Sequence, residues 1–309
     1  MAEYNILVIG AGAIGAYYGS ELANAGANVS VCIRSDYSVV KENGFKINSK
    51  GREYLFKPRQ VINNPKDFKG SADVVIVATK VLPEIDVINM LRHVVKDKTA
   101  IVLMQNGIKI ETPVIKEFPD NEVISALCFI CSSKVEPGVI HHMDYGHLTI
   151  GSHRNSITED IEMLSKLFNS VGVECNVTDN ITQARWKKLV WNAPFNPLSV
   201  IAGKVNTNKM VSSPTLLDLV RKVMLEVYVM AIADNTPFEV DFIDENINAT
   251  MNMKPYKPSM LLDYENKRPM EVEAILGNAV RFANEKKLLV PYIESLYATL
   301  KSLDEENRG

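Results

Sequence analysis

Short apolar runs alternate with helix-like stretches along the first half of the chain. The runs are rich in valine and isoleucine, which is typical of strands buried on both faces of a parallel sheet. The expected strands cover residues 5–10, 28–33, 72–79, 99–104, 122–130, 146–152 and 173–178. Because strands that alternate with helices form a parallel sheet with helices on both faces, the pattern predicts an N-terminal α/β domain with a mostly parallel sheet.

Helical periodicity replaces this alternation after about residue 178. Apolar residues then recur at three- and four-residue spacing, and prolines stand near the ends of the periodic segments. The expected helices cover residues 184–200, 216–235, 240–253, 271–287 and 293–303. We therefore expect two domains, an α/β domain over residues 1–178 and an all-helical domain over residues 179–309.

The composition indicates an ordinary globular protein. The 309 residues are 46% hydrophobic with a net charge of -3 and a pI near 6.0, so nothing favours binding to nucleic acid or to a membrane surface. The apolar run at residues 6–9 is too short to span a bilayer, and we expect a cytoplasmic protein. The sequence does not fix the oligomeric state, and a homodimer stays open.

Cysteine and histidine suggest little chemistry. The four cysteines are too few for a disulfide framework, and the CxxC formed by Cys128 and Cys131 lies in a run that predicts a buried strand. His141 and His142 are adjacent, so on a strand they point to opposite faces and are poorly placed to bind one ion. We expect no metal site.

Three glycines directly follow the first expected strand. Gly10, Gly12 and Gly15 form G-x-G-x-x-G, with Ala13 and Ile14 at the start of the next helix. The first glycine permits a tight turn, the second lets a pyrophosphate approach the backbone, and the third lets the helix pack on the strand. The helix N-terminus then offers N–H groups to phosphate. This arrangement predicts a Rossmann-type dinucleotide site rather than only a tight turn.

The end of the second expected strand indicates which dinucleotide binds. An NAD enzyme usually carries an acid here to bind the ribose hydroxyls, whereas this chain has Arg34. A guanidinium attracts the extra 2′-phosphate of NADP, with Ser35 as a second contact. The alternative is that Arg34 lies on a solvated loop and Asp36 serves a ribose. We favour NADP(H).

Two later strand ends also carry polar residues, at the edge of an open α/β sheet where ligands lie. Lys80 follows the strand expected at 72–79, and Asn106 and Gly107 follow the strand expected at 99–104. An Asn-Gly pair is also a common turn, so both interpretations of this pair stay open.

A polar row is expected along the first helix of the second domain. Lys188, Asn192 and Asn196 are spaced i, i+4, i+8 and share one face of a continuous helix. Lys187 lies about 100° away by helical geometry, and we expect it to face solvent. Lys188 could donate a proton to a carbonyl oxygen, but a structural explanation stays open, since Asn196 before Pro197 could be an N-cap.

A second polar cluster precedes the helix expected to begin at Glu271. It contains Ser259, Asp263 and Glu271. Taken alone, Asp263 and Glu271 could be a solvated loop acid and a first-turn acid favoured by the helix dipole.

In combination these segments resemble the ketopantoate reductases, or 2-dehydropantoate 2-reductases, over nearly the whole chain. The resemblance rests on GAGAIG with the arginine that follows it, on QNG, on W-K-K-L-x-x-N-x-x-x-N-P-L, and on P-S-M-L-x-D followed by E-V-E-A-I-x-G. One position departs, because the family often has threonine where this chain has Met270.

The resemblance implies reduction of 2-dehydropantoate by NADPH to pantoate, on the route to pantothenate and coenzyme A. It makes Lys188 the general acid, and Glu271 the group that holds the substrate hydroxyl. It places Asn106, Asn192, Asn196 and Ser259 around the substrate and nicotinamide, Arg34 on the 2′-phosphate and Lys80 near the cofactor ribose.

Two other functions stay open. A reductase of another small 2-oxo acid would share this architecture and would differ in whether its substrate has the hydroxyl that Glu271 would bind. A non-enzymatic NADP-binding sensor would keep the glycines and Arg34 but would not need Lys188 and Glu271 together.

Overall fold

The computed structural model describes residues 4–308, which form two compact units. Within these residues, unit 1 consists of 4–80, 85–105 and 111–181, and unit 2 consists of 81–84, 106–110 and 182–308. Two short segments that follow strands of unit 1 in the sequence therefore belong to unit 2.

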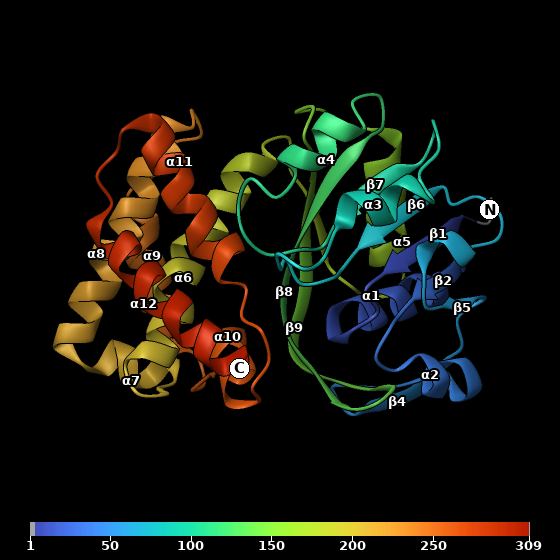
Figure 1. The fold of residues 1–309 in the computed structure, drawn as a ribbon, viewed down its shortest axis with the longest axis horizontal. Helices are drawn as coiled ribbons and strands as arrows, with labels where there is room; N and C mark the ends of the chain where they lie inside the picture. The colour runs from blue at the N-terminus through green and yellow to red at the C-terminus, as the bar shows by residue number, and fades with distance from the viewer. Residues whose placement is uncertain (1–3, 309) are drawn as a thin grey trace. The chain divides into compact units, whose positions relative to one another are not determined.

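Unit 1 is built on one mixed sheet (Figure 1). Its described strands are β1 (Asn5–Ile9), β2 (Asn28–Cys32), β3 (Phe45–Ser49), β4 (Arg52–Phe56), β5 (Val61–Ile62), β6 (Val74–Val77), β7 (Ala100–Leu103), β8 (Val123–Glu136), β9 (Val139–Ser152) and β10 (Cys175–Val177). They run in the order β4-β3-β9-β8-β7-β6-β1-β2-β5, with β10 beside β9. The pairs β3–β4 and β8–β9 are antiparallel, and the other pairs are parallel. The expected mostly parallel sheet is confirmed.

The connections place helices on both faces of this sheet. Helix α1 (Ala13–Asn24) links β1 to β2, and α3 (Val87–Arg92) links β6 to β7. Since β2 and β6 flank β1 on opposite sides, right-handed crossovers in opposite directions put α1 and α3 on opposite faces. The strand order reverses between β1 and β6, and such a switch point is where open α/β sheets bind ligands.

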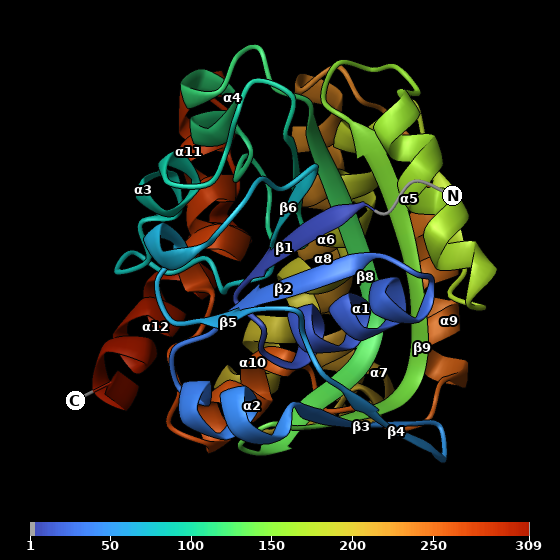
Figure 2. The ribbon, with the colours of Figure 1, turned by 90° about the vertical axis from the view of Figure 1, so that its right-hand side faces the viewer.

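The remaining helices of unit 1 are short or lie near the long hairpin. They are α2 (Tyr37–Asn43), α4 (Thr112–Glu117), α5 (Glu159–Ser170) and the short 3₁₀ turn η1 (Pro65–Asp67). Helix α5 packs on α1, β9 and β10, and α1 also contacts β8 and β9 (Figure 2). The hairpin of β8 and β9 extends beyond these helices and pairs with β3.

The core of unit 1 explains which strands the sequence predicted well. All four residues of β6 and of β7 are buried, because both faces of a central parallel strand are covered by helices. The hairpin β3–β4, by contrast, mixes exposed and buried positions and gave no clear apolar run. Strand β9 begins well before the expected residue 146, since its first half carries histidines and an aspartate and has exposed residues.

Unit 2 is helical, as expected. Its helices are α6 (Ile181–Ile201, from its second residue), α7 (Thr207–Ser212), α8 (Pro214–Ala233), α9 (Phe242–Asn252), α10 (Ser259–Glu265), α11 (Asn278–Lys286) and α12 (Pro291–Arg308), with a π-helical turn η2 (Glu273–Gly277) before α11. The core packs Trp186 and Phe195 of α6 among apolar residues of α8, α11 and α12. The single helix expected over 271–287 is confirmed over residues 272–286, with η2 as a π-helical turn inside it. Turns of this kind are frequent at functional sites.

Residues expected to carry no metal chemistry lie on the long hairpin. Cys128 and Cys131 are on β8, which confirms the strand, although both are half-buried rather than buried. His142 is buried and His141 is half-buried, on neighbouring positions of β9. Within residues 4–308, we find no group of three or more His, Cys, Asp or Glu side chains suited to a metal ion. In the same part of the chain no helix is long and apolar enough to cross a membrane.

Candidate active site

The glycine-rich turn of unit 1 connects β1 to α1. Gly10 has φ +89°, and a Cβ there would lie 2.6 Å from the backbone nitrogen of Thr79. A Cβ on Gly15 would lie 2.6 Å from the carbonyl oxygen of Gly10 and 3.1 Å from the Cβ of Ala78. Packing within the protein therefore accounts for glycine at both positions.

Gly12 is different, because the protein itself does not require glycine there. Its backbone is extended, with φ -79° and ψ -153°, and a Cβ would meet no atom within 4 Å. Gly12 is also the N-cap of α1, and no side chain caps this end. The first N–H groups of the helix, on Ala13 and Ile14, have no partners within the helix and need them from outside it. Glycine at this position keeps the surface open in front of those donors.

The loop after β2 carries an exposed arginine, Arg34, and a buried acid, Asp36. Arg34 and Ser35 are exposed, whereas Asp36 is 4% exposed. Lys134 Nζ donates to Asp36 Oδ1 over 2.8 Å, and the Gly138 N–H donates to Oδ2 over 3.1 Å. Burial alone would raise the pKa of Asp36, but these hydrogen bonds outweigh it and lower the pKa. Asp36 is therefore ionised, buried and already paired with Lys134 and Gly138, which disfavours the alternative role at a ribose considered for it.

Lys80 stands two residues beyond Ala78, where β6 has ended. Its side chain is half-buried. Lys80 directly follows Thr79, whose backbone lies against Gly10 of the glycine-rich turn. Its place at the switch point between β1 and β6 agrees with the expected position near a bound dinucleotide.

Unit 2 joins three predicted site residues by hydrogen bonds. Lys188 Nζ on α6 donates to Asn106 Oδ1 over 3.2 Å, and Asn106 Nδ2 donates to Glu271 Oε2 over 3.3 Å. The other carboxylate oxygen of Glu271 accepts the N–H of Val81 over 3.0 Å. An ammonium, an amide and a carboxylate that are far apart in sequence thus form one polar chain.

The two charged neighbours fix the orientation of the Asn106 amide. An ammonium can only donate and a carboxylate can only accept, so the amide oxygen must face Lys188 and the amide nitrogen must face Glu271. The opposite orientation would direct donors at each other on one side and acceptors at each other on the other. Asn106 therefore sets the positions of the cation and the anion relative to each other.

The loop that carries Asn106 is clamped onto η2. Gly107 has φ +97°, and a Cβ there would overlap the carbonyl group of Ala274. Arg185 Nη1 donates to the carbonyl oxygen of Gly107 over 2.9 Å, and Asn278 Nδ2 donates to the carbonyl oxygen of Ile108 over 2.7 Å. The Asn-Gly pair is thus a turn that needs glycine, and the same turn presents Asn106 to its partners.

The polar row on α6 is confirmed as a feature of one continuous helix. Asn196 lies inside α6, which continues to Ile201, so the interpretation of Asn196 as an N-cap is wrong. Asn192 is 9% exposed and Asn196 is 3% exposed, and the Oδ1 atom of Asn196 has no hydrogen-bond partner among residues 4–308. A buried polar atom without a partner costs about 1–3 kcal/mol, which favours a role for Asn196 toward a bound molecule.

Lys187 does not face solvent freely, contrary to the expectation. Its side chain is half-buried, and its Nζ lies 5.9 Å from the ring centroid of Phe238 and 5.1 Å from that of Phe242. The helical geometry correctly separates it from Lys188, but aromatic residues further along the chain cover this face, and a cation over an aromatic ring is stabilised.

The residues of the second polar cluster do not lie together in one environment. Ser259 is exposed at the first residue of α10, outside the Lys188–Asn106–Glu271 chain. Asp263 is buried and paired with Arg268 Nε at 3.0 Å, so it is not the solvated loop acid considered above. Met270, the position that departs from the family, is 1% exposed in the core of unit 2, and its N–H donates to Asp304 Oδ1 over 2.7 Å. The departing residue therefore lies in the core, directly before Glu271.

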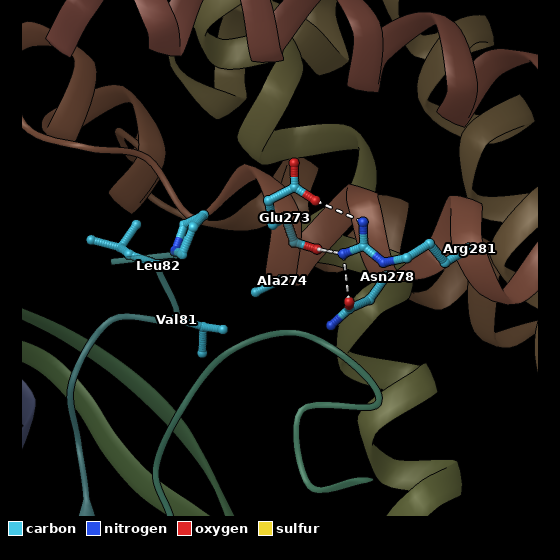
Figure 3. Close-up of a pocket in the computed structure, with 7 residues that line it drawn as sticks. Val81, Leu82, Glu273, Ala274, Asn278 and Arg281 are labelled. Carbon is cyan, nitrogen blue, oxygen red and sulfur yellow. Dashed lines mark hydrogen bonds and ion pairs between the residues drawn. The ribbon is translucent and has the colours of Figure 1, made fainter. Parts of the chain in front are cut away.

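A cavity of about 310 Å³ lies beside η2 in unit 2 (Figure 3). It is lined by Val81, Leu82, Pro83, Glu273, Ala274, Asn278 and Arg281. Arg281 donates to Glu273 Oε2 and to Asn278 Oδ1, each over 2.8 Å. The positive charge of Arg281 is thus balanced by Glu273. The apolar residues Val81, Leu82 and Pro83 also line the cavity, and the N–H of Val81 binds Glu271.

Sequence reasoning missed three groups that support this site. The Val81 N–H holds Glu271, and Arg185 and Asn278 hold the Asn106 loop. A backbone N–H has no signature in the sequence. Arg185 directly precedes the W-K-K-L segment, and its near-complete burial is the property that would have singled it out.

Comparisons with known proteins agree over the whole chain. The family model described as Ketopantoate reductase PanE/ApbA matches residues 6–155, and the model of the C-terminal part of the same family matches residues 180–304. A 2-dehydropantoate 2-reductase of Nostoc sp. is 35% identical, over 100% of this chain and 98% of that protein.

Solved structures give the same result. The crystal structure of 2-dehydropantoate 2-reductase from Methylococcus capsulatus is 42% identical, with a TM-score of 0.93 over 99% of this chain and 98% of that one. The ternary structure of D-mandelate dehydrogenase with NADH and anilino(oxo)acetate is 21% identical, with a TM-score of 0.90 over 99% of this chain and 100% of that one, and shares the fold.

The Rossmann-like unit, the helical unit and these relatives define an oxidoreductase. The chain belongs to the ketopantoate reductase family.

Proposed function

We propose that the protein reduces 2-dehydropantoate to pantoate with NADPH, as a step toward pantothenate and coenzyme A. The observation that carries this proposal is the hydrogen-bonded chain of Lys188, Asn106 and Glu271. It holds a proton donor and a hydroxyl acceptor at a fixed separation, which suits a substrate with both a ketone and a hydroxyl group.

The glycine turn and Arg34 support NADPH as the cofactor. Members of this family are pyridine-nucleotide-dependent reductases. Gly12 leaves open space before the uncapped start of α1, where a pyrophosphate can accept hydrogen bonds from the N–H groups of Ala13 and Ile14. Exposed Arg34 suits a 2′-phosphate, and Lys80 suits the ribose. When bound, NADPH supplies the hydride that reduces the ketone carbon.

The residues of unit 2 then supply position and charge. Lys188 donates a proton to the oxygen of the reduced ketone, and its positive charge stabilises that oxygen as negative charge develops on it. Glu271 accepts a hydrogen bond from the substrate hydroxyl, because a carboxylate offers about four lone-pair sites and Val81 and Asn106 each donate to a different one of its two oxygens.

The remaining predicted residues complete the binding site. Asn192 and Asn196 extend the row of Lys188 along α6, and the unsatisfied oxygen of Asn196 gives this row a polar group that a ligand can engage. Ser259 at the start of α10 contacts the substrate carboxylate together with backbone donors. In this proposal residues 1–178 form the NADP-binding domain and residues 179–309 the substrate domain.

Steady-state NADPH oxidation against a panel of 2-oxo acids that includes ketopantoate tests the proposed function. We expect ketopantoate to have the highest kcat/KM. A higher value for another 2-oxo acid would assign the protein to that substrate, and NADPH binding without turnover of any member would favour an NADP-binding sensor.

Replacing Arg34 by alanine is expected to weaken NADPH binding much more than NADH binding. A hydrogen bond to a charged group contributes about 1.5–3 kcal/mol, and only NADPH carries the phosphate that would lose it. Fluorescence titration of both cofactors measures the two dissociation constants. Equal losses for NADPH and NADH would remove Arg34 from the phosphate site.

Replacing Gly12 by serine is expected to weaken NADPH without destabilising the protein. Serine is a better N-cap than glycine and its Cβ meets no protein atom, so the melting temperature should hold or rise. The added side chain enters the space in front of α1, and overfilling a close contact costs about 1–3 kcal/mol. Gly15→Ala is the matched control, because its Cβ meets the Gly10 carbonyl and should lower the melting temperature. Unchanged NADPH affinity in Gly12→Ser would place the pyrophosphate elsewhere.

A further inference from the structure

Beside Arg34, unit 1 holds a second cation that neither the glycine motif nor the strand end predicts. Lys134 lies near the end of β8, and its Nζ is 2.8 Å from Asp36 Oδ1 and 3.2 Å from Ser35 Oγ. Ser35 directly follows Arg34 in the sequence. The long β8–β9 hairpin therefore brings an ammonium to the loop that carries the proposed phosphate ligand.

The surroundings of Lys134 leave it able to act on a ligand. Its side chain is 32% exposed, whereas that of Asp36 is 3% exposed. A lysine ammonium has three N–H donors, and Ser35 and Asp36 provide acceptors for two of them. The third can therefore point to a ligand on the solvent side of the loop.

Asp36 makes Lys134 necessary at this place. A carboxylate two residues from Arg34 would repel a 2′-phosphate, just as the usual acid of NAD enzymes does. Lys134 compensates the negative charge of Asp36 and, with the Gly138 N–H, keeps the carboxylate buried. The loop thereby presents net positive charge although its sequence contains an acid.

We propose that Lys134 is a specificity-determining residue for the cofactor 2′-phosphate: it neutralises Asp36, so that the charge of Arg34 acts on the phosphate without a competing acid, and it offers its third N–H donor to the phosphate. This inference rests on the proposed NADPH dependence and extends it to a residue about 100 positions away in the sequence. NADH has no 2′-phosphate, so Lys134 should contribute nothing specific to its binding.

The test compares NADPH and NADH dissociation constants, by fluorescence titration of the full-length protein, for wild type and Lys134→Met. Methionine keeps most of the length of the side chain and removes its charge. We expect NADPH affinity to fall by about tenfold or more, since charge-assisted hydrogen bonds to phosphate are among the stronger ones, while NADH affinity stays nearly unchanged. Lys46→Met is the matched control: Lys46 is also on the sheet of unit 1 and paired with an acid, Glu53, at 3.4 Å, and should leave both affinities unchanged.

A second variant, Asp36→Asn, separates the effect of the Lys134 charge on the phosphate from the role of the Lys134–Asp36 pair in holding the loop in place. If Lys134 acts through charge, Asp36→Asn removes a negative charge and NADPH binds as well as before or more tightly. Equal weakening of NADPH and NADH in Lys134→Met, or weaker NADPH binding in Asp36→Asn to the same degree as in Lys134→Met, would show a purely structural pair and overturn the proposal. Wild-type protein that does not prefer NADPH to NADH would instead overturn the proposed cofactor, so the two failures are distinguishable.

Discussion

Lys188→Ala is expected to lower kcat with ketopantoate by at least about 10²-fold, the usual loss on removing a general acid. Two effects add in this variant, because the substrate oxygen loses both its proton donor and the positive charge that stabilises it. Asn106 also loses the donor to its Oδ1 atom. Steady-state kinetics with saturating NADPH measures the change, and KM should change less than kcat if Lys188 acts mainly in the transition state.

Two control variants define what Lys188 contributes. Lys187→Ala removes the neighbouring ammonium from Phe238 and Phe242. This loss should cost about 0.5–2 kcal/mol of stability for a half-buried cation–π contact, with little change in kcat. Lys188→Arg keeps a positive charge but is a very weak acid, so it should recover only the part of the rate that charge alone provides. A large loss of kcat in Lys187→Ala with a small loss in Lys188→Ala would show that the wrong face of α6 was assigned.

The fold was largely predictable because its central elements are strongly patterned. Strands such as β6 and β7 are apolar at every position, and long helices such as α6 and α8 bury a regular set of apolar residues. The elements that were missed, including α7 and α10, span only six or seven residues, which is too short for a helical period to stand out. The π-helical turn η2 was also missed, because its residues fit an ordinary helix equally well.

The candidate site was predictable only within single elements. Helical spacing placed Lys188, Asn192 and Asn196 on one face, and α6 confirms it. The bonds that join Lys188 to Asn106 and Asn106 to Glu271 span 82 and 165 positions, and no local pattern encodes such contacts. The same holds for Asp36 and Lys134. The sequence left open a ribose contact for Asp36, and the structure shows this acid buried beside Lys134 of β8.

Wild-type protein is expected to prefer ketopantoate over 2-oxoisovalerate by well over the roughly 10–200-fold that one missing apolar group can produce. The two substrates share a skeleton, and 2-oxoisovalerate lacks only the hydroxymethyl group. If Glu271 accepts a hydrogen bond from that hydroxyl, the analogue lacks the donor for one charge-assisted hydrogen bond to this half-buried carboxylate. Such a loss costs more than the loss of a neutral contact.

Glu271 variants show whether this carboxylate is the source of the preference. Glu271→Ala should reduce the preference mainly by lowering kcat/KM for ketopantoate, since the analogue never used the bond. Glu271→Gln keeps an acceptor oxygen and nearly the same volume but loses the charge, so its preference should fall between those of wild type and Glu271→Ala. Because Glu271 also accepts from Val81 and Asn106, the melting temperature of each variant must accompany its kcat/KM values. If Glu271→Ala folds normally and keeps the full preference, or if wild type uses both substrates equally, the hydroxyl is not recognised by Glu271, and another small 2-oxo acid becomes the better substrate assignment.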